Sequence, residues 1–389
     1  MAKNHISYQA IWIVRIIVAA VFIFSGVVKA NDPIGFGYKL EEYFTVFGLP
    51  FLNDYKVAFA IFICSLEIIL GSLLIFGFWR KKVVWGLLLL TIFFTFLTFY
   101  SAYFEVVTSC GCFGDAIPLT PWQSFIKDCI LLLLISFLVY HQRKITPLIS
   151  DSYTRSILTA CIIVISVGLG VYTYNFLPIV DFLPYKVGNH LPSLMTVPEG
   201  ESLDEYETIY TLENERSGEV KKMTDKEYLS EEIWKDEEWK IIGDPETRLV
   251  KEGYQVPISD LIINDHEGIN RTDDIVANPD NILLIVAYDI NKANQPALLK
   301  MNKLAKDLAR DYRLHTVLLT ASTLADVESA IGDSTLYAEA LFADAVPLKT
   351  MVRSNPGLVL LRDGVVIKKW HFHLMPDAEQ LSSKYLSPE

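Results

Sequence analysis

Residues 11–30 read IWIVRIIVAAVFIFSGVVKA and contain two charged side chains, Arg15 and Lys29. A helix that crosses the hydrocarbon core of a membrane needs about 20 predominantly apolar residues. This stretch therefore predicts a membrane-spanning helix. The same pattern recurs in four further stretches, at residues 57–79, 83–104, 122–140 and 157–177. The first part of the chain is thus predicted to be an α-helical membrane bundle.

The charge of the chain is divided unevenly along its length. Residues 1–178 carry 12 basic and 9 acidic residues, and the rest of the chain carries 22 and 37, which gives the net charge of −12. The acidic part argues against nucleic-acid binding, because phosphate contacts need clustered positive charge. Its acidity is typical of a soluble domain that does not lie flat on anionic lipid. All five cysteines precede it, so it is not a disulfide scaffold.

Two short basic loops predict the orientation of the bundle. They read WRKK at residues 79–82 and HQRK at residues 141–144. Because basic residues concentrate in cytoplasmic loops, both loops and the N-terminus should face the cytoplasm. The loops between the other helices and the C-terminal part then face the periplasm, which predicts a bacterial inner-membrane protein. A cleaved signal peptide is the alternative for the first helix, but Arg15 and the four later spans argue against it.

Arg15 and Glu67 are charged residues inside predicted spans, where an unpaired charge costs a few kcal/mol or more. Counted from the cytoplasmic ends of their helices, their depths differ by about 8 Å at about 1.5 Å per residue. An arginine side chain spans such a gap, so we predict an Arg15–Glu67 pair that fixes how the first two helices align. A proton or quinone site is the alternative role. Lys29 is predicted to extend its ammonium group to the outer interface.

The string SCGCFGD at residues 109–115 falls in a loop predicted to face the periplasm, where disulfides persist. A disulfide needs Cα atoms about 4.4–6.8 Å apart, and residues i and i+2 lie at most about 7 Å apart. A turn at Gly111 would bring Cys110 and Cys112 within range, because glycine adopts the φ values of such turns. A strained disulfide is more oxidising and more labile, which suits exchange chemistry.

Other roles for these two cysteines stay open. A closed zinc site needs about four ligands, and the outer loops offer no evident His or Cys partner, so no metal is predicted. Inert residues in a tight turn are the main alternative. Asp115 and Lys127 lie close in sequence, and a lysine beside a thiol favours the reactive thiolate. Cys64, Cys129 and Cys161 are predicted to be buried apolar residues within helices, and Cys129 is also the candidate resolving thiol.

A resemblance to a known family is carried by Arg15 and three strings. The strings are FSGVVKANDPIGF (24–36), SLEIILGSLLIFG (65–77) and CGCFGD (110–115). With them, about residues 8–140 resemble the DoxX superfamily, and more narrowly its MauE branch, which is named for methylamine utilisation. The resemblance implies a four-helix unit, similar to the core of vitamin K epoxide reductase. It also implies a role in disulfide formation or in maturation of periplasmic partners.

The chain is predicted to form four parts: the four-helix unit at 1–150, a fifth helix and linker at 151–180, an acidic insertion at 181–254, and a final domain at 255–389. The insertion is expected to pack against the final domain. In that domain, apolar runs at 281–290 and 315–322 are typical of buried strands, and residues 296–312 are amphipathic at helical spacing. A second helix at 324–332 and a hairpin turning at 363–364 complete a mixed α/β sheet.

This order resembles the thioredoxin fold over about residues 255–380. Pro356 matches the cis-proline of that family, and GLVLLRDGVVIKKW (357–370) matches its closing hairpin. The place of the Cys–x–x–Cys motif reads YDINKANQPA (288–297), without cysteine. The resemblance therefore implies a recognition module that binds a partner in a cleft near Asn355 and Pro356. The two histidines of HFH (371–373) are predicted to lie on a solvated face.

Two functions from different classes fit these features. The first is a thiol–disulfide oxidoreductase in which Cys110 and Cys112 exchange electrons with a periplasmic protein partner, with a membrane quinone as the candidate carrier. The second is a non-catalytic membrane scaffold or accessory subunit whose C-terminal domain recruits a partner. A transporter fits less well, because only Arg15 and Glu67 lie deep in the predicted spans.

Overall fold

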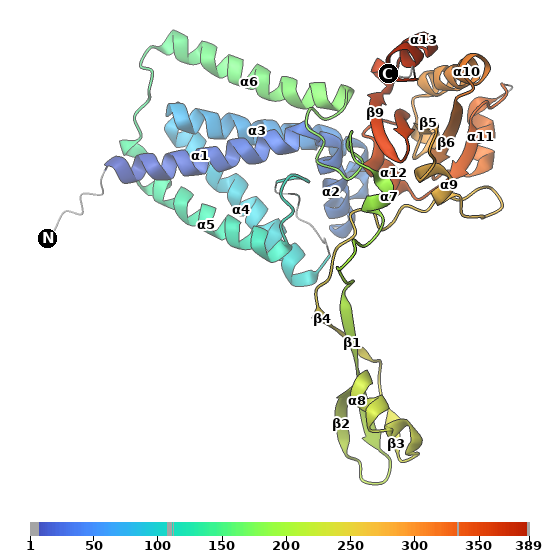
Figure 1. Ribbon diagram of the computed structural model, residues 1–389. Coiled ribbons are helices and arrows are strands. Elements are labelled where there is room, and N and C mark those ends of the chain that lie inside the picture. The colour runs from blue at the N-terminus through green and yellow to red at the C-terminus, as the bar shows by residue number, and fades with distance from the viewer. Residues whose placement is uncertain (1–7, 107–110, 112, 333, 387–389) are drawn as a thin grey trace.

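The computed structural model describes residues 8–106, 111, 113–332 and 334–386. It shows a helical bundle, an α/β domain beside one end of the bundle, and a long arm that projects from their junction (Figure 1). Within the described residues, five helices are long and apolar enough to cross a membrane, as predicted. They are α1 (Tyr8–Asn31), α3 (Lys56–Phe76), α4 (Arg80–Phe104), α5 (Pro121–Tyr140) and α6 (Ser152–Asn175).

Helices α1 and α3 form the closest pair of the bundle, and two glycines explain why. A Cβ atom on Gly26 of α1 would lie 2.8 Å from the carbonyl oxygen of Cys64, and one on Gly71 of α3 would lie 3.0 Å from that of Ala19. Small residues let membrane helices approach closely and gain van der Waals contact. Helices α4 and α5 pack beside this pair, and α6 lies along α3 (Figure 1).

Replacing Gly26 by alanine should destabilise the bundle by about 1–3 kcal/mol, because the new methyl group overpacks the contact between α1 and α3. Besides the Cys64 carbonyl, it would meet Cγ1 of Ile68 at 2.7 Å. Unfolding of the purified protein in mixed micelles measures the effect. Gly168→Ala on α6 is the matched control, since nothing lies within 4 Å of a Cβ there. Equal stability of both variants would show that α1 and α3 do not pack this closely.

The predicted outer loop at 31–56 contains a helix, α2 (Pro33–Val46), that lies across one end of the bundle (Figure 1). Asp32 caps it by accepting a hydrogen bond from the Gly35 N–H at 2.8 Å. We call this end of the bundle the α2 end. The two basic loops meet at the opposite end, where Arg80 donates hydrogen bonds to the carbonyl oxygens of Arg143 (2.9 Å) and Ile145 (3.0 Å).

The C-terminal domain contains a mixed sheet of the strand order β7-β6-β5-β8-β9. Strands β5, β6 and β7 are parallel, and β8 and β9 form the predicted antiparallel hairpin. The short strand β7 and its edge position were not predicted. The strands are β5 (Asn281–Val286), β6 (His315–Thr320), β7 (Glu339–Phe342), β8 (Gly357–Arg362) and β9 (Val365–His371).

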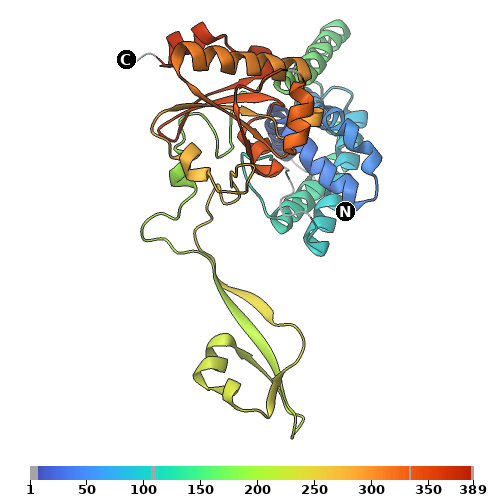
Figure 2. The ribbon, with the colours of Figure 1, turned by 90° about the vertical axis from the view of Figure 1, so that its right-hand side faces the viewer.

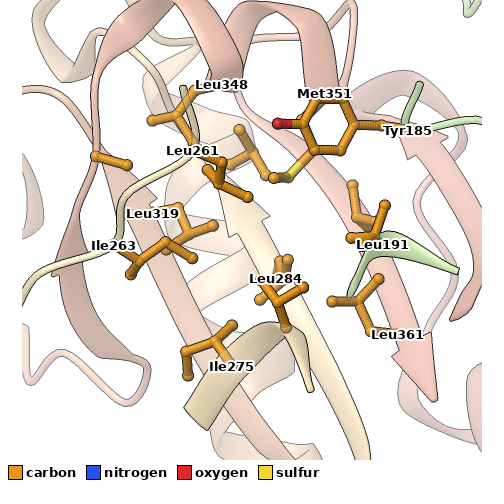
Figure 3. Packing of buried hydrophobic residues seen from close by; sticks show 14 of the residues in the cluster. Tyr185, Leu191, Leu261, Ile263, Ile275, Leu284, Leu319, Leu348, Met351 and Leu361 are labelled. Carbon is orange, nitrogen blue, oxygen red and sulfur yellow. The ribbon is translucent and has the colours of Figure 1, made fainter. Parts of the chain in front are cut away.

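Helices cover both faces of this sheet. Leu283 and Ile285 of β5 point to the face covered by α10 (Gln295–Tyr312), α11 (Leu324–Ile331) and α13 (Ala378–Leu381). Leu284 points to the other face, where α9 (Thr272–Val276), α12 (Ala345–Met351) and α7 (Leu191–Leu194) pack. Figure 3 shows Leu284 on this second face between Ile275, Leu191 and Met351. Successive side chains of a strand point to opposite faces of the sheet, and both faces are buried here. This explains why the run at residues 281–290 is apolar almost without interruption.

The acidic insertion does not pack against the C-terminal domain as a whole, and that prediction is wrong for residues 205–251. These residues form an arm that extends away from the rest of the molecule (Figures 1 and 2). Its charged side chains pair with one another, as in Lys222–Glu246 at 2.6 Å. The arm comprises β1 (Glu205–Asn214), β2 (Val220–Thr224), α8 (Asp225–Ser230), β3 (Trp239–Ile241) and β4 (Glu246–Lys251). Only the preceding segment, through Tyr185 and Leu191, enters the core of the domain.

Candidate functional site

The cysteine loop follows α4 and reaches the α2 end of the bundle. Cys110 and Cys112 lie outside the described residues, so the predicted bond between them is not described. Gly111 between them has a φ of +65°, the left-handed conformation that the predicted turn requires. Gly111 lies close to α2, because a Cβ atom added to it would be 3.3 Å from Cγ of Lys39.

Phe113, which follows Cys112 in the chain, anchors the loop on the bundle. Its ring centroid lies 5.5 Å from that of Phe24 on α1, and Nζ of Lys127 on α5 lies 5.0 Å from it. Nζ of Lys127 is also 2.8 Å from Oδ1 of Asp128. The structure therefore brings the predicted Lys127 to the cysteine loop, where a positive charge favours a thiolate.

The remaining cysteines are free thiols on three helices. Cys64 on α3 is buried, as predicted, and Cys129 on α5 is half-buried. Cys161 is exposed, so its predicted burial is wrong. The reason is that α6 packs against the bundle along one side only, which leaves most of its residues exposed. The role of Cys129 as a resolving thiol stays a prediction.

Arg353, which follows α12, joins the C-terminal domain to the α2 end. Its Nε donates to Oδ2 of Asp32 at 2.8 Å, and its Nη2 lies 3.6 Å from Oδ2 of Asp115. The arginine side chain is only 7% exposed. Burial lowers the pKa of Arg353, but the two carboxylates outweigh burial and leave it raised, so the guanidinium stays charged. Asp115 thus connects the cysteine loop to the C-terminal domain.

Two further contacts hold the same junction. Nζ of Lys369 on β9 donates to Oδ2 of Asp181 at 2.6 Å. The hydroxyl group of Tyr38 on α2 donates to that of Tyr288 at 3.2 Å. Burial is the main reason that the pKa of both tyrosines is raised, so both hydroxyl groups stay protonated. Tyr288 begins the string that stands in place of a Cys–x–x–Cys motif.

A cavity of about 750 Å³ lies between the α2 end and the C-terminal domain. We call it the junction cavity. Its volume is that of a typical ligand site, for which about 300–1,000 Å³ is usual. Its walls come from α2, the cysteine loop, the linker after α6, and α12 with the residues that follow it. Lining residues from these walls include Tyr38, Lys39, Gly111, Gly114, Asp115, Asp181, Lys349 and Arg353.

The charged residues inside the predicted spans pair differently from the prediction. Nζ of Lys29 lies 2.5 Å from Oε1 of Glu67, and their side chains are 3% and 1% exposed. Arg15 instead donates to the carbonyl oxygen of Leu74 at 2.6 Å and to that of Ile75. The predicted Arg15–Glu67 pair is therefore wrong, and so is the predicted extension of Lys29 to the interface.

The direction of helical side chains explains both corrections. A side chain leans toward the N-terminus of its own helix. Because α1 and α3 run in opposite directions, Lys29 leans into the bundle and Glu67 leans toward the α2 end, so they meet. Arg15 leans away from Glu67, toward the C-terminal turn of α3. The last carbonyl groups of a helix lack intrahelical donors and carry its negative dipole end, which suits a guanidinium.

The histidines at the end of β9 lie against α6. His371 is 4% exposed, and its Nδ1 accepts a hydrogen bond from the backbone N–H of His373 at 3.2 Å. The prediction of a solvated face is therefore wrong for His371. Nδ1 of His373 lies 2.8 Å from the carbonyl oxygen of Asn175, the last residue of α6. In the described part of the chain, no three His, Cys, Asp or Glu side chains form a group that would hold a metal ion.

Burial, aided by the nearby His373, lowers the pKa of His371 from 6.5 to about 4. The unfolded chain thus takes up a proton at higher pH than the folded chain, so stability is lost as pH falls from 6.5 toward 4. We expect this histidine to account for up to about 3 kcal/mol of that loss. Thermal unfolding across this pH range measures it. His371→Asn, which keeps an acceptor but does not titrate, should flatten the profile, and an unchanged profile would contradict the assignment.

The residues predicted to bind a partner lie beside the junction. The Asn355–Pro356 peptide bond is cis, as the thioredoxin resemblance implies. Pro356 is buried, and the amide group of Asn355 donates to the carbonyl oxygen of Asp289 at 2.8 Å. Their role in partner binding stays a prediction.

Sequence reasoning missed the residues that dock the two parts, among them Asp32, Tyr38 and Arg353. One signal was available. Asp32 followed by Pro33 is a typical helix start, with an N-cap acceptor and proline at the first helical position. It predicts a helix within the loop that follows the first span. Nothing in the sequence alone indicates that Arg353 pairs with Asp32, because 321 positions separate them.

Comparison with known proteins supports the resemblance of the bundle. Residues 7–141 match the family "Methylamine utilisation protein MauE". "Protein TlpB" of Flavobacterium psychrophilum is 29% identical over 145 residues, which are 36% of this chain and 39% of that protein. The match thus spans well under half of the length of that relative. No solved structure matches the chain. The N-terminal region of this membrane protein therefore contains a MauE family domain.

Proposed function

We propose that this protein is a membrane-bound thiol–disulfide oxidoreductase that oxidises or matures periplasmic proteins through Cys110 and Cys112. The observation that carries the proposal is the position of their described neighbours. Gly111, Gly114 and Asp115 line the junction cavity, which the C-terminal domain closes from the other side. This cavity of about 750 Å³, which is lined by the residue between the two cysteines in the sequence, admits a segment of a partner protein.

The proposed reaction is disulfide exchange. A thiolate of the partner attacks one sulfur of the Cys110–Cys112 bond, which forms a mixed disulfide and releases the other sulfur as a thiolate. A second partner thiolate then resolves the mixed disulfide. The partner leaves oxidised by two electrons, and Cys110 and Cys112 are left reduced. Lys127 beside Phe113 and Lys39 beside Gly111 supply the positive charge that stabilises the departing thiolate.

The C-terminal domain serves in this proposal as a thioredoxin-like recognition module. Its strand order β6-β5-β8-β9 and the proline before β8 support that assignment. Without cysteines it exchanges no disulfide itself. It holds the partner instead, through the wall of the junction cavity formed by Lys349, Thr350 and Arg353, directly before Asn355 and Pro356.

The proposed location is the bacterial inner membrane, with the α2 end in the periplasm. Support comes from the two basic loops, which Arg80 brings together at the end opposite to α2. Basic loops remain on the cytoplasmic side. The cysteine loop and the junction cavity then share the oxidising compartment.

A quinone head group does not fit around the buried Glu67. Two cavities among the described residues touch Glu67 and measure about 20 and 30 Å³, whereas sites for small organic ligands measure about 300 Å³ or more. The proposal therefore concerns exchange with thiol-bearing proteins only, and the quinone stays a prediction.

Trapping of a mixed disulfide tests the proposal. In a Cys112→Ser or Cys110→Ser variant, the one remaining thiol of the pair can still form a mixed disulfide with a partner. The neighbouring thiol that would resolve this bond is missing. Cells that express either variant should accumulate covalent adducts of this protein, which non-reducing electrophoresis reveals and a reductant removes. Mass spectrometry should assign the bond to the remaining cysteine of the pair.

Cys161→Ser is the matched control, because Cys161 is an exposed free thiol on the surface of α6. This variant should form no more adducts than the natural protein. If neither single variant forms adducts, and the double serine variant leaves the thiol state of envelope proteins unchanged, the protein is a scaffold rather than an oxidoreductase.

A further inference from the structure

One oxygen atom deep in the bundle lacks a partner. Glu67 is 1% exposed, and while its Oε1 contacts Lys29, its Oε2 accepts no hydrogen bond from any described residue. Leaving a buried acceptor unsatisfied is costly, and more so for a charged group. Such atoms are commonly satisfied by ordered water where the site is polar and large enough.

Space for water exists at this oxygen. Two cavities of about 20 and 30 Å³ adjoin Glu67, and Ser25, Phe94 and Lys127 line both of them. One water molecule needs about 10–15 Å³, so each cavity holds one or two water molecules. The hydroxyl group of Ser25 and the ammonium group of Lys127 supply the polar partners that such waters need.

The two cavities connect Glu67 to a second pair of charges near the cysteine loop. The smaller one is also lined by Asp128, whose Oδ2 accepts a hydrogen bond from Thr98 at 3.1 Å and whose Oδ1 pairs with Lys127. The larger one is also lined by Lys29, which in turn lines the junction cavity. Glu67 thus shares one small cavity with Asp128, and it shares the other with Lys29, which also lines the junction cavity.

We propose that these residues form a water-linked proton-transfer site inside the bundle. Lys29 gives a proton to Glu67 and regains one from water of the junction cavity, so that Glu67 becomes a neutral acid while Lys29 stays charged. Glu67 then passes the proton through the cavity waters to the Asp128 carboxylate. The groups that face Glu67 are Ser25 and Lys29 on α1, Cys64 on α3, Tyr43 on α2, Thr98 on α4, and Lys127 and Asp128 on α5.

This site differs from a charge pair that only stabilises the bundle, because Glu67 exchanges protons with water of the junction cavity at the α2 end. It does not depend on the thiol chemistry proposed above. A purely structural pair would leave Glu67 ionised and isolated from water.

Infrared difference spectroscopy of the full-length protein in lipid nanodiscs tests the proposal. After a drop in pH, a band of a protonated buried carboxyl group should appear and should shift in D₂O. Glu67→Gln should abolish this band, and Glu105→Gln, which removes an exposed acid after α4, should leave it in place. The absence of such a band in the natural protein would overturn the proposal.

Two variants that keep the Lys29–Glu67 pair test the water path. Asp128→Asn removes the second carboxylate, and Ser25→Val fills both cavities with methyl groups. Each should slow the decay of the Glu67 band after the pH is raised again by about tenfold, the effect of losing one good hydrogen bond. Because both variants retain Glu67 and its partner, the band should keep its full amplitude. An unchanged rate in both variants would show that no proton moves through these cavities.

Discussion

Replacing Arg353 by alanine should release the C-terminal domain from the bundle. The guanidinium joins Asp32 on one side and Asp115 on the other, and it is 7% exposed. Removing one partner of a buried ion pair costs about 3–5 kcal/mol, because the other charge is left without compensation. We therefore expect hydrogen–deuterium exchange in α2 and α12 to accelerate about a hundredfold or more, as measured by mass spectrometry.

Two companion variants define this result. Arg353→Lys should recover little of the loss, because an ammonium group does not reproduce a fork of donors that reaches two carboxylates. Arg310→Ala, which removes an exposed arginine paired with Asp311, should leave exchange in α2 unchanged. Unaltered exchange in Arg353→Ala would mean that the domain docks by other contacts, and the junction cavity would lose its fixed wall.

Replacing Lys29 by methionine should have a comparable effect within the bundle. The variant leaves Glu67 buried without its cation, so the carboxyl group either stays charged at high cost or takes up a proton. We expect the free energy of unfolding in mixed micelles to fall by about 3–5 kcal/mol.

The double variant Lys29→Met/Glu67→Leu provides the comparison. It replaces the pair by apolar side chains of similar size, which is often neutral or stabilising. Its stability should return to within about 1 kcal/mol of the natural protein. If the single variant is as stable as the double one, the ion pair at 2.5 Å contributes nothing to the bundle.

The periodic and compositional features of this chain could be predicted from sequence, and the long-range contacts could not. Runs of about 20 apolar residues identify the spans, because a membrane sets the length of a helix. The strand–helix order of the C-terminal domain follows in the same way from the apolar runs around Leu284 and Leu318. The position of the arm could not be predicted. The acidic composition of residues 205–251 indicates that they are solvated, but it does not indicate whether they pack against a neighbouring domain.

The partners of the charged residues illustrate the limit more sharply. Depth along the helices brings Arg15 and Glu67 within reach of each other. Depth alone omits the direction in which side chains lean. Because of that direction, Glu67 pairs with Lys29, and Arg15 contacts the C-terminal end of α3. The Arg353–Asp32 contact depends on how two domains dock, and no local pattern encodes that arrangement.

The thiol state and location of Cys110 and Cys112 test the central claim most directly. Cells with an opened outer envelope are treated with a membrane-impermeant maleimide, with and without prior reduction, and the labelled cysteines are identified by mass spectrometry. We expect both cysteines to be labelled only after reduction, and without permeabilising the inner membrane. Labelling that requires a permeabilised inner membrane, or that is the same before and after reduction, would contradict it.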